Sequence, residues 1–395
     1  MYDTYDTYKN LIERFPTTEA LFSYLRSQEG GRLIIRQSND VPLSVIYYDK
    51  TVTNMELPHV RAFRSVVWDD KKNRPVCVSP HKGFDLATSS AAVAAHKRLR
   101  VEDFVDGVMI NQFWDGTQWR LSTRTTLDAK SSFYGTYRQG PSFAELFDNT
   151  LKEQTGMTRS QFPTIYCYSW VLQHPAERIV VGCKYGIPTI TLVGCYLINP
   201  VTADVTLVEP DNLNNIPRPT LHTDLCSVED CIARAEAWGR RFKHEFQGLV
   251  AYHPETGIRY RIRTAEYTAA RELRGNQSNL RYLWLERWSQ GRLAAYLSIY
   301  PEETAEAENT IAEFKRATEE LYHWYQRVYK HRELPLGQVP HKFRKFLWDI
   351  HRSNAGAYFP ALRAYVNGQD TARKLWLVNY DKRYGSAVSN TTDNQ

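Results

Sequence analysis

Three arginines alternate along one short segment, RYRIR, and their spacing points to anion chemistry. Arg259, Arg261 and Arg263 are separated by Tyr260 and Ile262. Residues two apart in a β-strand share a face, so the three guanidinium groups are expected on one side of a sheet. Such groups repel one another unless an anion or several carboxylates lie among them, and their planar N–H groups match phosphate oxygens. The alternative is an edge strand whose solvated charges prevent aggregation, and the sequence leaves both possibilities open.

Three other segments place polar residues at strand ends, where strand packing alone does not require them. The segments are FRSVVWDDKKNRPVCVSPHKGFD, FVDGVMINQFWDGTQWRLSTRTT and YSWVLQHPAERIVV. Each has a plain structural explanation when taken alone: a solvated lysine, an Asp-Gly turn and an ion pair in a turn. The residues of interest are Arg64, Lys82, Asp106, Gly107, Arg124, Glu177 and Arg178.

These residues need a scaffold, and the periodicity of the chain predicts an α+β fold. Residues 1–30 are expected to be helical. Short β-rich runs separated by Asn, Asp, Gly and Pro follow, which is typical of antiparallel sheets, with Asp115-Gly116 as a hairpin turn. Helical spacing dominates from about 266. We therefore expect a helical segment 1–30, a sheet domain 31–285, a helical domain 286–385 and a mobile tail 386–395.

The composition excludes several classes of protein. The 395 residues are 42% apolar and 24% charged, which indicates a globular chain with more than one core. The apolar runs are shorter than the roughly 18 residues of a membrane span, and the first residues do not form a secretion signal. Six cysteines without a CxxC pair fit a reducing compartment. We expect a cytoplasmic protein, with the nucleus left open.

Taken in order, these segments resemble motifs of the covalent nucleotidyltransferase superfamily, most closely ATP-dependent RNA ligases of the phage T4 RNA ligase 1 type. The resemblance covers about residues 30 to 285. FVDGVMINQFWDG is similar to the Lys-x-Asp-Gly motif, whose lysine takes AMP from ATP in that family. QGLVAY resembles a Glu-Gly-x-Val motif and RYRIRTAEY a Lys-x-Lys motif. FRSVVWD and SPHKG resemble upstream segments that contact the ATP phosphates. The resemblance implies an antiparallel-sheet nucleotidyltransferase domain followed by an all-helical one.

The sequence departs from this pattern at several positions. Phe104 stands where the nucleophilic lysine is expected, Ser169 and Gln247 where two glutamates are expected, and Arg261 with Arg263 where two lysines are expected. A phenylalanine cannot form a bond to AMP. Another lysine amine must then attack the α-phosphorus, with its pKa lowered by neighbouring cations so that part of it is unprotonated.

The resemblance implies a role for each candidate residue. Lys82 is the relocated nucleophile, and Arg261 with Arg263 stabilises negative charge, since arginine stays protonated and cannot attack. A divalent cation, Mg²⁺ or Mn²⁺, is assigned to Asp106 and Glu177, although Asp106 can instead bind the ribose hydroxyls. The nucleotide-binding residues are Arg64, Asp106, Gly107, Arg124, Arg178 and Gln247.

The implied function is ATP-dependent sealing of RNA 5′-phosphate and 3′-hydroxyl ends, as in RNA repair, through a lysyl-AMP intermediate. Expected partners are a nucleotide and single-stranded or nicked RNA ends, bound by a monomer without a membrane. Two alternatives remain open. The chain can be a catalytically inactive ligase-like protein that binds RNA or nucleotide, or a capping-type guanylyltransferase that uses GTP.

The charge distribution locates the anionic partner more closely. The net charge is +6, and residues 240–292 carry eleven Lys or Arg and five Glu, so 11 − 5 = +6 accounts for the whole excess. We therefore expect the anion to bind this segment and the rest of the surface to attract it little. Aromatic and basic residues also interleave between 280 and 380, a pattern that can stack single-stranded bases but more often forms a helical core.

Overall fold

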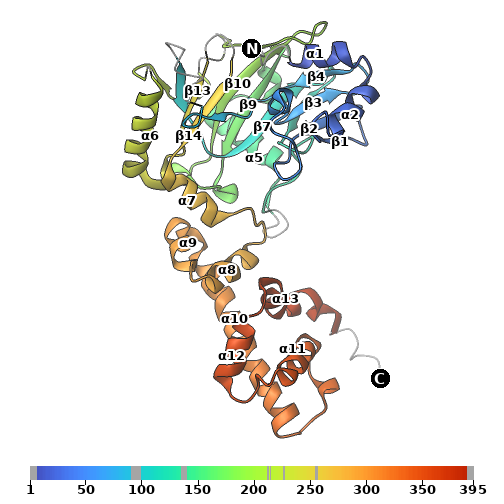
Figure 1. Ribbon diagram of the computed structural model, residues 1–395, viewed down its shortest axis with the longest axis vertical. Coiled ribbons are helices and arrows are strands. Elements are labelled where there is room, and N and C mark those ends of the chain that lie inside the picture. Colours follow the sequence, from blue (N-terminus) through green and yellow to red (C-terminus); the bar gives the residue numbers. More distant parts are fainter. Residues whose placement is uncertain are drawn as a thin grey trace. The chain divides into compact units, whose positions relative to one another are not determined.

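The computed structural model describes residues 7–89, 99–134, 140–210, 213, 215–225, 227–253 and 257–388, and the chain forms two compact units, Met1–Glu272 and Leu273–Gln395 (Figure 1). The fold is α+β, with antiparallel sheets in the first unit and helices in the second, as predicted. The units divide before the expected boundary after residue 285, which falls inside a helix. Most of the expected mobile tail, from 389 on, lies outside the described residues.

The first sheet of unit 1 has the strand order β1-β2-β3-β4 and is antiparallel throughout. Two helices pack against it through Tyr8 and Phe22, which lie in one core with Phe63 and Trp68. The second helix begins at Thr18, and the Thr17 hydroxyl caps it by accepting a hydrogen bond from the Ala20 amide. The elements are α1 (Thr7–Arg14), α2 (Thr18–Arg26), β1 (Ile34–Gln37), β2 (Leu43–Tyr47), β3 (Val66–Asp69) and β4 (Arg74–Cys77).

The second sheet has the order β11-β10-β9-β7-β8 and is covered by helix α5. The β7–β8 hairpin turns at Asp115 and Gly116, as predicted, and Gly116 has a φ of +102° that favours glycine. The elements are β7 (Val108–Trp114), β8 (Trp119–Ser122), α5 (Phe143–Thr155), β9 (Tyr166–Gln173), β10 (Thr189–Ile198) and β11 (Val205–Leu207).

The third sheet, of order β12-β6-β13-β14-β5, holds the arginine-rich strand. Strands β13 and β14 pair antiparallel, and residues 254–256 between them lie outside the described residues. Strand β5 pairs with β14 in parallel, so this sheet is mixed and not purely antiparallel. The elements are β5 (Phe84–Asp85), β6 (Arg100–Asp103), β12 (Leu221–His222), α6 (Val228–Phe242), β13 (Gly248–Tyr252) and β14 (Arg259–Arg263).

Unit 2 is built from helices around a core that includes Leu285, Phe314, Leu321 and Phe343. The division between the units, after Glu272, falls inside the last turn of helix α7 (Ala265–Arg274). Among the described residues, no helix is long and apolar enough to cross a membrane. The remaining helices are α8 (Leu280–Ser289), α9 (Leu293–Ile299), α10 (Thr304–Tyr325), α11 (His341–Arg352), α12 (Phe359–Asn367) and α13 (Thr371–Val388).

Candidate functional site

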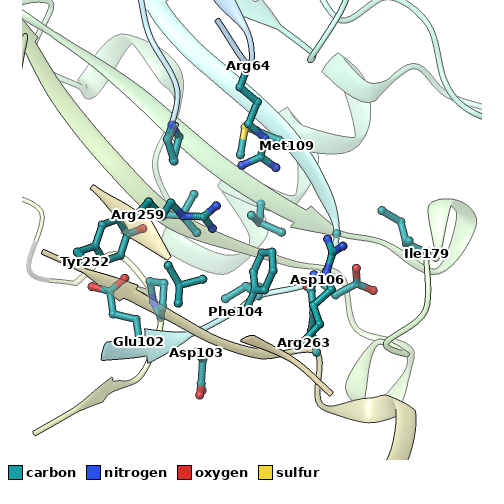
Figure 2. A pocket seen from close by; sticks show the side chains of 18 of the residues that line it. Arg64, Glu102, Asp103, Phe104, Asp106, Met109, Ile179, Tyr252, Arg259 and Arg263 are labelled. Carbon is teal, nitrogen blue, oxygen red and sulfur yellow. The ribbon is translucent and has the colours of Figure 1, made fainter. Parts of the chain in front are cut away.

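A cavity of about 110 Å³ lies in unit 1, and residues associated with all three sheets line it (Figure 2). Arg64 comes from the segment before β3, Met109 from β7 and Val250 from β13. Cations outnumber the acidic groups that face them. The charged and polar lining residues are Arg64, Glu102, Asp103, Asp106, Gln247, Tyr252, Arg259, Arg263 and Arg271.

Strand β14 delivers two of these cations. Tyr260 points into the core of the third sheet, so the alternation of the strand sends Arg259 and Arg263 to the opposite face, where both line the cavity. Arg259 is only 8% exposed. The Nε atoms of both arginines are buried and have no hydrogen-bond partner among the described residues. Because β14 is paired on both sides, the solvated edge-strand interpretation of its arginines is wrong.

Phe104 occupies the space between these two arginines. It directly follows β6, and its amide donates a hydrogen bond to the Gly248 carbonyl at 2.9 Å. The guanidinium carbons of Arg259 and Arg263 each lie 5.2 Å from the centroid of the Phe104 ring. Figure 2 shows the ring between the two arginines. The negative face of an aromatic ring attracts cations, so this ring holds both guanidinium groups at the cavity wall.

The lowered pKa values of two arginines show that positive charge in the cavity is not balanced. Burial, followed by Arg259, lowers the pKa of Arg64 to about 10. Burial, followed by Arg261 and Arg271, lowers the pKa of Arg263 to about 10. Both shifts mean that the charged form is disfavoured where it stands, because water has been removed and like charges are close. An anion in the cavity would relieve this cost.

Lys82 lies beside this cavity and does not line it. Its amide donates to the Arg61 carbonyl at 3.0 Å, just before β5 pairs with β14. Burial lowers the pKa of Lys82 to about 8, with further contributions from Arg61, Arg261 and Lys50. A lysine with this pKa is about one tenth unprotonated at pH 7, which is about 300-fold more than an ordinary lysine. Arg261 contributes to this shift and does not line the cavity, so it lies nearer to Lys82 than to the cavity.

Two cations that the sequence analysis missed belong to this neighbourhood, Lys50 and Arg61. Burial lowers the pKa of Lys50, and Arg261, Arg263 and Arg124 add to the shift. Burial also lowers the pKa of Arg61, and Arg261 adds to that shift. Both residues lie outside 240–292, so the cations near β14 do not come only from the segment that carries the net positive charge. Neither belongs to a motif, and only their spatial proximity to β14 identifies them.

Asp106 is a buried acceptor whose hydrogen bonds hold the neighbouring backbone. One carboxylate oxygen accepts from the amides of Val180 and Val181 at 3.0 and 2.9 Å, and the other accepts from the Tyr267 hydroxyl at 2.6 Å. Gly107, which follows it, has a φ of +144°, and an added Cβ would meet the Leu172 carbonyl. These contacts fix the orientation of Asp106 at the cavity wall.

Glu177 faces a different part of the protein. Its carboxylate accepts hydrogen bonds from the amides of Phe133 and Tyr134, and it does not line the cavity with Asp106. Across the described residues, no three His, Cys, Asp or Glu side chains come together as a metal-binding group. Since the carboxylates assigned to a divalent cation already bind backbone amides, this donor set does not fit a metal held by the protein.

The other candidate residues divide between the cavity and its surroundings. Gln247 lines the cavity, and its buried Oε1 has no hydrogen-bond partner among the described residues. Arg124 lies outside, exposed, and donates to the Tyr48 carbonyl at 2.7 Å. Arg178 also lies outside and pairs at 3.5 Å with Glu245, a residue just before β13 and not one of the turn that holds Arg178. Ser169 is buried in β9 and donates to Asn111 at 2.9 Å, away from the cavity.

No protein-family model matches the sequence. The chain is similar to the immediate-early protein ICP-46 homolog of Invertebrate iridescent virus 3, with 22% identity over 293 residues, or 70% of this chain. It covers 62% of that relative's length. Among solved structures it is similar to an archaeal ATP-dependent RNA ligase, with 12% identity, a TM-score of 0.41 and 78% of each chain covered. It is also similar to a Naegleria gruberi RNA ligase with PPi, with 10% identity, a TM-score of 0.36, and 49% of this chain and 58% of that chain covered.

Proposed function

We propose that this chain is an ATP-dependent nucleotidyltransferase that seals RNA ends, with Lys82 as the residue that takes up AMP. The observation that carries the proposal is a lysine of pKa about 8 beside a group of half-buried and buried cations that have no paired carboxylate within the described ranges of the chain. Triphosphate is the natural ligand for such a group, because guanidinium N–H groups bind phosphate oxygens in pairs. The motif order of the sequence supports the same chemistry.

The first step joins lysine to the nucleotide. The unprotonated Lys82 amine attacks the α-phosphorus of ATP, the new N–P bond forms as the bond to the β-phosphate oxygen breaks, and pyrophosphate leaves. The nitrogen, which is positively charged once it has bonded to phosphorus, then loses one proton to solvent. Arg261 and Arg263 neutralise negative charge that develops on the phosphate oxygens, a role that needs permanent cations and no proton transfer.

The second and third steps use the RNA ends. An oxygen of the RNA 5′-phosphate attacks the lysine-bound phosphorus, the N–P bond breaks, and Lys82 regains its proton as AMP moves to the RNA. The 3′-hydroxyl then attacks the RNA 5′-phosphorus, forms the phosphodiester and releases AMP. In this scheme Asp106 and Gly107 shape the cavity, and Gln247 offers its unpartnered Oε1 to a ribose hydroxyl or a base amino group.

The test is covalent labelling with nucleotide. Protein incubated with α-labelled ATP in buffer containing Mg²⁺ should retain label after denaturation. Both Lys82→Ala and Lys82→Arg should lose it, because neither side chain supplies an unprotonated amine. The matched control Lys72→Ala, at an exposed lysine paired with Asp69, should keep it. Labelling from GTP in place of ATP would instead favour the capping-type alternative, and label retained by Lys82→Ala would refute the assignment.

A second candidate function is nucleotide or RNA binding without catalysis. One observation favours it: the Phe104 ring fills the position where the resemblance expects the nucleophile, between two arginines. This version predicts ATP binding that is reversible, sensitive to salt and never covalent. Tight binding of ATP without any retained label in the wild-type protein would select it over the ligase.

A further inference from the structure

Unit 2 contains a cavity of its own, of about 330 Å³, between helices α8, α10 and α12. These helices pack together within the unit, and Figure 1 shows α12 beside α10. The cavity combines aromatic rings with two cations, one amide and the carboxylate of Glu319. The lining residues that matter here are Trp288, Phe314, Lys315, Phe359, Arg363 and Asn367.

The aromatic part of the lining comes from three different helices. Phe314 is buried at the base, with its ring centroid 5.5 Å from that of Trp288 in an edge-to-face arrangement. Phe359 begins α12, and the next residue, Pro360, fixes the start of that helix. Trp288 and Phe359 are only half-buried, so the packing of the unit leaves part of each ring accessible. Flat rings placed this way can stack a planar ligand.

The cations of the cavity lack the partners that neighbouring cations have. Lys342 pairs with Glu320, and Arg373 pairs with Asp349. Lys315 and Arg363 are exposed and, within the described part of the chain, form no ion pair with a carboxylate. The guanidinium of Arg363 lies 5.8 Å from the Phe359 ring centroid, so one cation is held next to one stacking surface. This juxtaposition suits a ligand that carries a planar ring and a negative charge.

We propose that this cavity binds one nucleotide of single-stranded RNA. The base stacks on the rings of Phe359 and Trp288, and a backbone phosphate lies between Lys315 and Arg363. The Asn367 amide donates to and accepts from the edge of the base. The proposal deepens the proposed function, on which its choice of RNA rests, by placing a substrate contact in unit 2. A peptide aromatic side chain would satisfy the rings but would leave both cations without a counter-charge.

The test measures RNA binding apart from ligation. The full chain is titrated into fluorescent single-stranded RNA with a 5′-hydroxyl and a blocked 3′ end, which cannot be sealed. Phe359→Ala should weaken binding about tenfold, the size of one stacked base. Arg363→Ala should weaken it severalfold and reduce the slope of log affinity against log salt by about 0.7, one phosphate contact. The matched controls Trp348→Ala and Arg352→Ala remove another exposed aromatic and its cation, on α11, and should change neither quantity.

An RNA with one abasic position isolates the stacking contact. Wild-type protein should bind it about tenfold more weakly than intact RNA, and Phe359→Ala should bind both RNAs equally. Arg363 is exposed, so its variants test the site even where Phe359→Ala reduces folding. Unchanged affinity and salt slope in Arg363→Ala, or equal losses in the α11 controls, would overturn the proposal. Absence of lysyl-AMP in the wild-type protein counts against the proposed function alone, because this binding test needs no ATP.

Discussion

Buried and half-buried cations in the two units have opposite surroundings. In unit 2, Arg274 lies 3.4 Å from Glu303, whose other oxygen accepts hydrogen bonds from Tyr296 and Trp284 at 2.6 and 2.9 Å. Arg281 likewise pairs with Glu313. Around the cavity of unit 1, by contrast, Arg64, Arg259 and Arg263 have no ion pair with a carboxylate among the described residues.

The contrast separates structural charges from functional ones. A buried cation with a bonded carboxylate is satisfied within the fold, and breaking the pair leaves an isolated charge. A buried cation without one is costly in the empty protein and is stabilised when an anion arrives. The arginines of unit 1 therefore indicate a ligand that is itself anionic. Variants of the paired and the unpaired cations test this difference.

The largest effect is expected in unit 2. Glu303→Ala leaves Arg274 buried without its carboxylate and should lower the free energy of unfolding of the unit by about 3–5 kcal/mol. Urea denaturation measures the change. The matched control is Glu308→Ala at an exposed position of α10, which should cost less than about 0.5 kcal/mol. If the two variants were equally stable, the pairing in unit 2 would have no structural role.

Removing an unpaired arginine should weaken ligand binding and leave the stability of the empty protein intact, unlike the Glu303→Ala change. Arg259→Ala or Arg263→Ala should weaken ATP binding about 10- to 100-fold, the loss of a charged hydrogen bond worth about 1.5–3 kcal/mol. The free energy of unfolding without ATP should stay the same or rise, since an uncompensated charge is removed. Calorimetry gives the affinity. The control is Arg240→Ala on the exposed face of α6, which removes the same single positive charge. A large loss of stability without ATP would show that these arginines are structural.

An intermediate effect is expected at Phe104. Phe104→Leu removes the ring that contacts both arginines and should cost about 1–2 kcal/mol of unfolding free energy, the sum of two cation–π contacts. Phe104→Tyr keeps the ring and serves as the control. Thermal denaturation without ATP compares the stabilities of the two variants. Equal stability would mean that the ring does not substitute for the missing carboxylates.

The smallest effect is a pH dependence from Lys82. Its folded pKa of about 8 is below the 10.5 of an ordinary lysine, so between these values the unfolded chain binds more protons than the folded one. Stability without ATP should therefore rise from pH 8 to 10.5, and by less than about 1 kcal/mol because the amine is partly solvated. Lys82→Met should flatten this part of the profile. A fall in wild-type stability over the same range would contradict the lowered pKa.

Local patterns explain why much of the fold was predictable. The alternation of RYRIR placed Tyr260 in the core and sent Arg259 and Arg263 to the other face. The Asp115-Gly116 turn defined the β7–β8 hairpin in the same local way, since both depend on a few adjacent residues. The parallel pairing of β5 with β14 depends on residues about 175 positions apart and has no local signal.

The candidate site was only partly predictable for the same reason. Lys82 and the β14 arginines belong to motif-like segments, so the sequence analysis found them. Lys50 and Arg61 approach β14 only through tertiary structure, and the contact of Phe104 with two guanidinium groups joins β6 to β14. The resemblance assigned Asp106 to a metal or a ribose, whereas its partners in the structure include the Val180 and Val181 amides, which lie far away in the sequence and have no local signal.

Peptide mapping after incubation with ATP shows whether the unpaired cations prepare one lysine to accept AMP. Mass spectrometry of the digested protein should find AMP on the peptide that contains Lys82. The rate of its formation should rise about tenfold per pH unit up to about pH 8 and then level off, because only the unprotonated amine attacks. AMP on Lys50 or on any other lysine, or no covalent AMP at all, would contradict the account.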